Sequence, residues 1–147
     1  MSSPNVNSKF MRPFWKTNSR LLVKQLRDKS SDITATPVNV WIQGFVESVY
    51  NDFDVIRLRD SDGCIVVRSC NHVPGGLDWL KAIADESARR QKYCQILGEA
   101  VDIYDGEVQV RAIKIVDISE DAALQKSWPN EVNEFANVLS GAIKGFR

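Results

Sequence analysis

The side chains that could carry out catalysis are few and scattered in this sequence of 147 residues. His72 is the only histidine, and no cluster of cysteines or carboxylates accompanies it, so a structural role fits it better than a catalytic one. Asp85 and Glu86 are neighbours in an expected helix, where their side chains diverge by about 100° and do not form an acid–base pair. Walker, dinucleotide-binding and nucleophile-elbow motifs are absent. The sequence therefore predicts a protein that is not an enzyme and needs no cofactor.

The cysteines point away from metal binding. Cys64, Cys70 and Cys94 give an odd count without Cys-x-x-Cys spacing, which argues against a disulfide framework and against a zinc site. Cys64 and Cys70 stand in or beside a strand-like run, where cysteine behaves as a small buried hydrophobe. We expect buried thiols and a reducing compartment, the cytosol or the nucleus.

The spacing of apolar residues along the chain predicts the strands and helices that must position any site. Apolar and polar residues alternate, or β-branched residues cluster, between turn signals, and this predicts strands at 38–50, 55–59, 65–68, 93–103 and 108–118. Apolar residues at helical spacing predict helices at 77–91 and at about 130–144. Gly44 and Gly98 inside strands suit a sheet that bends to close.

Three strands, a helix and two further strands form the order of a five-stranded OB-fold barrel. We therefore predict an all-β domain with flanking helices, a helix between its third and fourth strands, and a carboxy-terminal interface helix. The predicted divisions are a flexible amino-terminal arm at 1–19, the OB-fold domain at 20–128 and the carboxy-terminal helix at 129–147. No apolar run approaches the length of about 20 residues that spans a membrane.

One hypothesis for such a barrel is binding of single-stranded DNA. Arg57, Arg59 and Arg68 could supply positive charge, and Tyr50 and Phe53 could stack bases. Alternatively, the arginines cover a solvated strand face and Phe53 plugs one end of the barrel. The 19 basic side chains equal the 19 acidic ones in number, which argues against tight autonomous binding.

The other hypothesis is a subunit held by a partner. Val132, Phe135 and Leu139 lie along one face of the carboxy-terminal helix, which the barrel does not need for closure. This apolar stripe could fold back on its own barrel, or it could contact a helix of a second OB-fold protein. An unburied stripe of this size would be a liability, which favours the contact with a partner.

Several short motifs resemble the RecQ-mediated genome instability protein 2 family in their order and spacing. They are WIQG at 41–44, RLRD at 57–60, VP at 73–74, the strand around Gly98, AIK at 112–114, DIS at 117–119, SW at 127–128 and EV at 131–132. The resemblance covers roughly residues 20–135, and the segment 75–92 is longer than the corresponding loop of the family.

This resemblance implies a non-catalytic subunit that pairs with an OB domain of RecQ-mediated genome instability protein 1. The pair joins topoisomerase III and a Bloom-type RecQ helicase in the nucleus, dissolves double Holliday junctions during DNA repair, and recruits a Fanconi-anaemia helicase. DNA is then reached mainly through partners.

Three residues match positions with roles in that family. Arg20 matches a basic position implicated in holding the sister subunit. Lys114 and Trp128 match positions implicated in the recruitment groove. From its chemistry alone, Trp128 could equally cap the start of the carboxy-terminal helix, and Lys114 could be a solvated strand lysine.

Overall fold

The computed structural model describes residues 14–28 and 38–145, with side chains up to residue 138 in the last helix. Its elements, in chain order, are β1 (Trp15–Lys16), α2 (Ser19–Asp28), β2 (Val38–Tyr50), β3 (Val55–Arg59), β4 (Cys64–Arg68), the 3-10 turn η1 (Cys70–His72), α4 (Gly76–Ala82), α5 (Glu86–Arg89), β5 (Tyr93–Tyr104), β6 (Glu107–Asp117) and α6 (Ala122–Gly145). Within these ranges no helix is long and apolar enough to cross a membrane.

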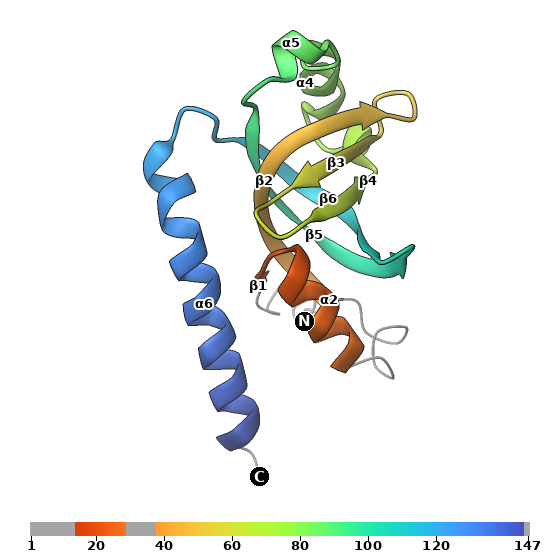
Figure 1. Ribbon diagram of the computed structural model, residues 1–147. Coiled ribbons are helices and arrows are strands. Elements are labelled where there is room, and N and C mark those ends of the chain that lie inside the picture. Colours follow the sequence, from red (N-terminus) through yellow and green to blue (C-terminus); the bar gives the residue numbers. More distant parts are fainter. Residues whose placement is uncertain (1–13, 29–37, 146–147) are drawn as a thin grey trace, which may run out of the picture.

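Strands β2 to β6 close into a barrel around one core (Figure 1). The first half of β2 pairs with β5 and its second half with β3, both antiparallel. The pairs β3–β4 and β5–β6 are also antiparallel, and the parallel pair β4–β6 completes the closure. This pairing confirms the predicted five-stranded OB-fold. The short strand β1 extends the sheet by a parallel pairing with β2.

The glycines inside two strands allow backbones to approach closely. A Cβ atom on Gly44 would lie 2.7 Å from the carbonyl oxygen of Arg59, and one on Gly98 would lie 2.5 Å from that of Arg111. Gly98 also follows a register shift between β5 and β6, the mark of a bulge. Both residues therefore sit where the sheet bends and any side chain would collide with backbone.

Helices cover the two ends of the barrel. Leu22 and Leu26 of α2 are fully buried at one end, and Leu80 and Ile83 from the segment around α4 are buried at the other (Figure 1). The apolar cluster that the sequence contains at 20–27 is thus one face of a helix. Its burial extends the hydrophobic core beyond the sheet itself.

The single helix predicted at 77–91 is wrong. The structure has α4 up to Ala82, a break, and the short α5. The guanidinium of Arg89 donates hydrogen bonds to the carbonyl oxygens of Ile83 at 3.3 Å and of Ala84 at 2.6 Å. Because Arg89 provides donors for these two carbonyl oxygens, the chain can leave the helix at this point without burying unpaired backbone groups. The apolar spacing at 77–91 is therefore compatible with two short helices.

The boundaries at the two ends of the chain also differ from the prediction. The last helix begins at Ala122 rather than near residue 130, and Pro129 lies inside it. Asp121 caps the start of this helix, because its carboxylate accepts a hydrogen bond from the amide of Leu124. The predicted arm reaches residue 19, whereas β1 already belongs to the sheet. Residues 1–13 lie outside the described part of the chain.

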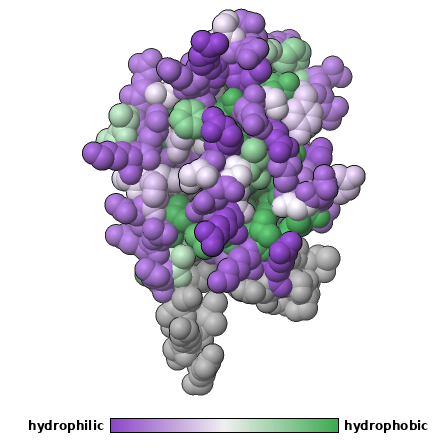
Figure 2. Space-filling model, in the orientation of Figure 1, coloured by the Kyte–Doolittle hydropathy of each residue, from purple (hydrophilic) through white to green (hydrophobic). Residues whose placement is uncertain are grey.

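The surface of the barrel is largely hydrophilic on the face shown in Figure 2, where apolar side chains appear as small separate areas. Exposed large hydrophobic side chains occur singly along several elements, for example Tyr104 at 70% and Ile113 at 46% exposure. Scattered apolar residues of this kind are ordinary for a folded surface, so any partner site needs more specific support.

Candidate functional site

Trp128 packs on the chain's own barrel. Its ring lies against that of Trp41 on β2, with centroids 5.7 Å apart and planes tilted by 38°. Trp128 is 5% exposed, and the buried Nε1 atoms of both indoles have no hydrogen-bond partner among the described residues. The contact between the two indoles is therefore one of apolar and ring-to-ring packing.

Trp41 belongs to a row of four residues that crosses the sheet. Lys16 pairs with Trp41 between β1 and β2, Trp41 pairs with Leu97 of β5, and Leu97 pairs with Lys114 of β6. Residues paired in this way project from the same face of a sheet. Lys114 is exposed. The fold thus brings Lys114 and Trp128, two of the predicted partner residues, to one face of the sheet. We name the four paired residues on this face the Trp41 row.

A charged contact fixes the first half of α6 over this row. The Nζ atom of Lys16 lies 3.0 Å from a carboxylate oxygen of Glu131 and 4.8 Å from the ring centroid of Trp41. Ser127 donates a second hydrogen bond to Glu131 at 2.8 Å. The hydrogen bond from Ser127 and the pairing with Lys16 lower the pKa of Glu131 below its usual value. Val132, the next residue, is 1% exposed.

The second half of α6 continues past the barrel (Figure 1). Phe135 is half-buried, and Val138 is 68% exposed. Leu139 belongs to α6, and its side chain lies outside the described part of the structure. Val132 thus packs on the barrel, as the fold-back alternative describes, whereas Phe135 is only half-buried and Val138 is exposed.

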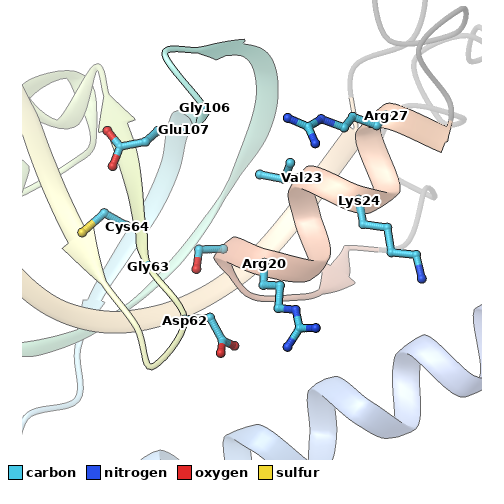
Figure 3. A pocket seen from close by; sticks show the side chains of 10 residues that line it. Arg20, Val23, Lys24, Arg27, Asp62, Gly63, Cys64, Gly106 and Glu107 are labelled. Carbon is cyan, nitrogen blue, oxygen red and sulfur yellow. The ribbon is translucent and has the colours of Figure 1, made fainter.

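Arg20 stands at the start of α2, beside a cavity between this helix and the turns of the sheet (Figure 3). Asn18 caps the helix by accepting a hydrogen bond from the amide of Leu21 at 2.9 Å. Asp60 accepts further bonds from the amide and hydroxyl of Ser19 at 2.7 and 2.6 Å. Arg20 is exposed beside these caps.

Arg57, a predicted DNA contact, is held by carboxylates. Its guanidinium donates two hydrogen bonds to Glu107, at 2.7 and 2.5 Å, and one to Glu47 at 2.7 Å. The bonds to Glu107 are the main reason that the pKa of Arg57 is raised. The charge of Arg57 is thus balanced within the protein, and little remains for phosphates.

The other three predicted DNA contacts each have a different partner within the chain. Arg68 donates a hydrogen bond to Gln109 at 2.7 Å. Phe53 is partly buried against the core, the arrangement that the barrel-plug alternative describes. Arg59 turns instead toward Phe45, with its guanidinium carbon 5.5 Å from the ring centroid.

Sequence reasoning missed an aromatic pair beside α6. Phe45 and Tyr93 meet edge to face with centroids 4.9 Å apart, and the Tyr93 hydroxyl lies 3.2 Å from the side-chain oxygen of Gln43. They line a cavity of about 560 Å³ between α6 and β2. Trp41, Gln43 and Phe45 alternate along one strand, so the line of large outward side chains was a signal that could have located this cavity.

Two of the three thiols are buried, as expected, and Cys64 is not. Cys70 and Cys94 are buried and Cys64 is half-buried, all three as free cysteines. Burial raises the pKa of Cys70 to about 12 and raises that of Cys94 as well. Within residues 14–28 and 38–145, no three His, Cys, Asp or Glu side chains gather to hold a metal ion.

Known sequences identify the family of this chain. The model of RecQ-mediated genome instability protein 2 matches residues 11–136. The chain belongs to this family. RecQ-mediated genome instability protein 2 of Gallus gallus is 34% identical over 101 residues, which cover 68% of the chain and 67% of the relative. That of Mus musculus is 31% identical over 97 residues, which cover 66% of the chain and only 58% of the relative.

A solved structure agrees with the architecture. The crystal structure of the S. pombe Stn1–Ten1 complex superposes with a TM-score of 0.53 at 12% sequence identity, and the match covers 76% of this chain and 79% of that one. At this identity the likeness concerns the fold alone. It agrees with the OB-fold that the strand pairing gives.

Proposed function

We propose that the chain is a non-catalytic OB-fold subunit that pairs with RecQ-mediated genome instability protein 1. In this proposal the pair joins topoisomerase III and a Bloom-type RecQ helicase in the nucleus and supports the dissolution of double Holliday junctions. Membership in the family supports the role in genome stability. The observation that carries the pairing is the second half of α6, which leaves the barrel while Val138 stays 68% exposed.

The geometry favours a helix as the partner element. Phe135 and Val138 lie one turn apart on α6, so an apolar helix of the sister subunit could pack along them. The first half of α6 is fixed to the barrel through Trp128 and Glu131, so the second half is presented in a defined direction. Such preorganisation lowers the entropic cost of binding. Arg20, exposed at the start of α2, is available for a carboxylate of the same partner.

The Trp41 row is the surface that we propose for a third partner, in this family a Fanconi-anaemia helicase. Lys114 provides an exposed cation on β6, and Leu97 provides half-buried apolar surface between it and Trp41. Trp128 contributes through its packing on Trp41, because it holds α6 at the border of the row. This surface lies on the described barrel itself, so it can be tested separately from the α6 contact.

The pairing is tested by co-expression with the carboxy-terminal OB domain of the sister subunit, followed by size-exclusion chromatography with light scattering. The wild-type chain is expected to give a one-to-one complex. The double substitution Phe135→Asp and Val138→Asp is expected to abolish it, because two charges would be buried without partners. Val132 is left unchanged, since it is buried within the chain.

A matched control comes from the same helix. Asn133 and Asn137 are exposed and lie on the side of α6 opposite to Phe135 and Val138. The substitutions Asn133→Asp and Asn137→Asp add the same charge, and the complex should persist. Loss of the complex in both double variants, or its persistence in both, would reject the proposed face of α6.

A further inference from the structure

A cavity of about 540 Å³ lies between α2 and two turns of the barrel (Figure 3). Gly63 belongs to the turn between β3 and β4, and Gly106 belongs to the turn between β5 and β6. Val23 lies in the opposite wall, on α2, and Arg27 extends from the same helix toward the β5–β6 turn. Because neither glycine carries a side chain, the main chain of a bound segment can approach both turns closely.

The wall that α2 contributes carries three cations, which we name the α2 stripe. Arg20, Lys24 and Arg27 line the cavity and are exposed, whereas Leu22 and Leu26 on the other side of the helix are buried. The three cations fall within an arc of about 60° and span about 10 Å along the helix axis. The first turn of α2 has no acidic residue, and no described carboxylate forms an ion pair with any of the three. The fold itself therefore leaves this positive charge unbalanced.

The wall opposite the α2 stripe is acidic. Asp62 is exposed and has no ion pair with a described residue, whereas Glu107 is bound by the guanidinium of Arg57 at 2.7 and 2.5 Å. A nucleic-acid strand carries a charge on every unit, so this wall would repel it. A peptide places N–H donors between its acidic side chains, and such donors suit the carboxylate of Asp62. The two walls together therefore favour an acidic peptide over a polyphosphate.

The volume of the cavity favours an extended segment over a helix. A helix about 10 Å across that follows the stripe for about 10 Å occupies roughly 800 Å³. An extended segment about 4.8 Å thick and about 10 Å broad occupies roughly 500 Å³ over the same length. Only the extended segment fits within the 540 Å³ of the cavity.

The spacing of the cations indicates where the acidic residues of such a segment lie. Arg20 and Lys24 are about 6 Å apart along the axis of α2. Alternate residues of an extended chain are about 6.8 Å apart and project from the same side. Carboxylates at every second position therefore lie opposite successive cations of the α2 stripe, and the residues between them face the two glycine turns.

We propose that this cavity binds an extended, acidic segment of a partner protein. Carboxylates at alternate positions of the segment pair with the α2 stripe, and its main chain lies against Gly63 and Gly106. The site differs in place and in chemistry from the second half of α6 and from the Trp41 row. It gives the chain a contact with acidic proteins beyond the assembly proposed above.

An NMR titration of the ¹⁵N-labelled full chain tests the inference. The probe is a peptide of about five Thr–Glu repeats, because threonine favours the extended form and glutamate then occupies every second position. At low salt the amide signals of Gly63 and Gly106 should shift with increasing peptide, and added NaCl should weaken the binding. The amide signal of Gly75, which belongs to neither wall, should stay in place.

Two variants test the two walls separately. The double substitution Lys24→Glu and Arg27→Glu should raise the dissociation constant of the peptide at least about tenfold, because two attractions become repulsions. Gly106→Asn changes no charge and places a side chain in the cavity wall, so it should raise the dissociation constant at least about threefold. Asparagine accepts the φ of 78° at this position, and an added Cβ there meets no atom within 4 Å.

Each variant has a matched control at the end of the barrel opposite to α2 (Figure 1). Lys81 and Arg90 are exposed and lack ion pairs with described residues. The substitutions Lys81→Glu and Arg90→Glu should keep the dissociation constant within about twofold. Gly75 has a φ of 75° and the same open space, so Gly75→Asn should also leave it unchanged. Arg20 is kept in all variants, because the proposed pairing also uses it, so failure of one proposal leaves the other untouched.

Four results would overturn the inference. They are the absence of shifts at Gly63 and Gly106 in the wild type, an equal loss in the charge control, unchanged binding in Gly106→Asn, and equal shifts with an oligothymidylate of the same charge. The last result would assign the α2 stripe to any polyanion rather than to an acidic peptide. The dispersion of the amide signals of each variant establishes that it is folded.

Discussion

Arg57 and Glu107 face each other across the β3–β4–β6 surface in a two-pronged ion pair, with N–O distances of 2.7 and 2.5 Å. Glu47 accepts a third hydrogen bond from the same guanidinium. On this side of the barrel, where OB-folds commonly bind single strands, a central cation is thus already neutralised.

Replacement of Arg57 by Ala should therefore cost stability only modestly. The free energy of unfolding is expected to fall by about 1 kcal/mol, the range for a partly exposed pair. Urea denaturation measures this difference. A loss of about 3 kcal/mol or more would show that the pair contributes as a buried ion pair does.

Trp128 should tolerate phenylalanine and not alanine. Trp128→Ala removes the ring that packs on Trp41 and is expected to cost about 3–5 kcal/mol of unfolding free energy. Trp128→Phe keeps an aromatic ring and removes an indole nitrogen that has no described partner, so its cost should be smaller, about 1 kcal/mol.

Trp79 provides the contrast for this prediction. Its indole nitrogen donates a hydrogen bond to Asp117 at 3.0 Å, so Trp79→Phe loses a real bond and leaves a carboxylate oxygen with one donor fewer. Thermal unfolding of Trp128→Ala, Trp128→Phe and Trp79→Phe gives the order of their stabilities. If Trp128→Ala were as stable as the wild type, the first half of α6 would not be packed on the barrel in solution.

Gly98 should not accept a side chain. A Cβ at this position would lie 2.5 Å from the backbone oxygen of Arg111, which cannot move without breaking the β5–β6 pairing, so Gly98→Ala should cost about 3 kcal/mol. Gly75 is the control, because it has a φ of 75° and no atom within 4 Å of an added Cβ. Gly75→Ala should cost only about 1 kcal/mol, from backbone strain alone. Denaturant melts that gave equal losses would contradict the close-contact explanation.

The sequence was sufficient for the barrel because each strand is a local pattern. Arg57 and Arg59 alternate with buried Ile56 and Leu58, and the Asp105–Gly106 turn adopts positive φ angles of 52° and 78°, as a tight hairpin requires. The strand β1 could not be found in this way. Two residues carry no period, and their parallel pairing exists only once β2 is in place.

The candidate site was predictable only in part, for a similar reason. Lys114 and Trp128 could be named from motifs, but their common face depends on the register of four strands. The charge balance of Arg57 depends on carboxylates 10 and 50 residues away along the chain. The start of α6 at Ala122 also depends on tertiary contacts, because Pro129 inside the helix removes a backbone hydrogen bond, and packing by Trp128 can offset this cost.

Acid should weaken the docking of α6 through Glu131. The pKa of Glu131 is lowered from its usual 4.5, first by the hydrogen bond from Ser127 and then by Lys16, so folding favours the ionised carboxylate. The resulting stabilisation is fully present above about pH 4.5 and is lost as the pH falls through the lowered pKa. The variant Glu131→Gln should be less stable than the wild type at pH 6, and the difference should shrink as the pH falls below 4.5 and through the lowered pKa. Glu120, exposed and without a hydrogen bond to described residues, gives the control Glu120→Gln, which should match the wild type throughout. Thermal melts followed by tryptophan fluorescence measure both differences, and a gap between Glu131→Gln and wild type that does not change with pH would exclude this carboxylate as the source.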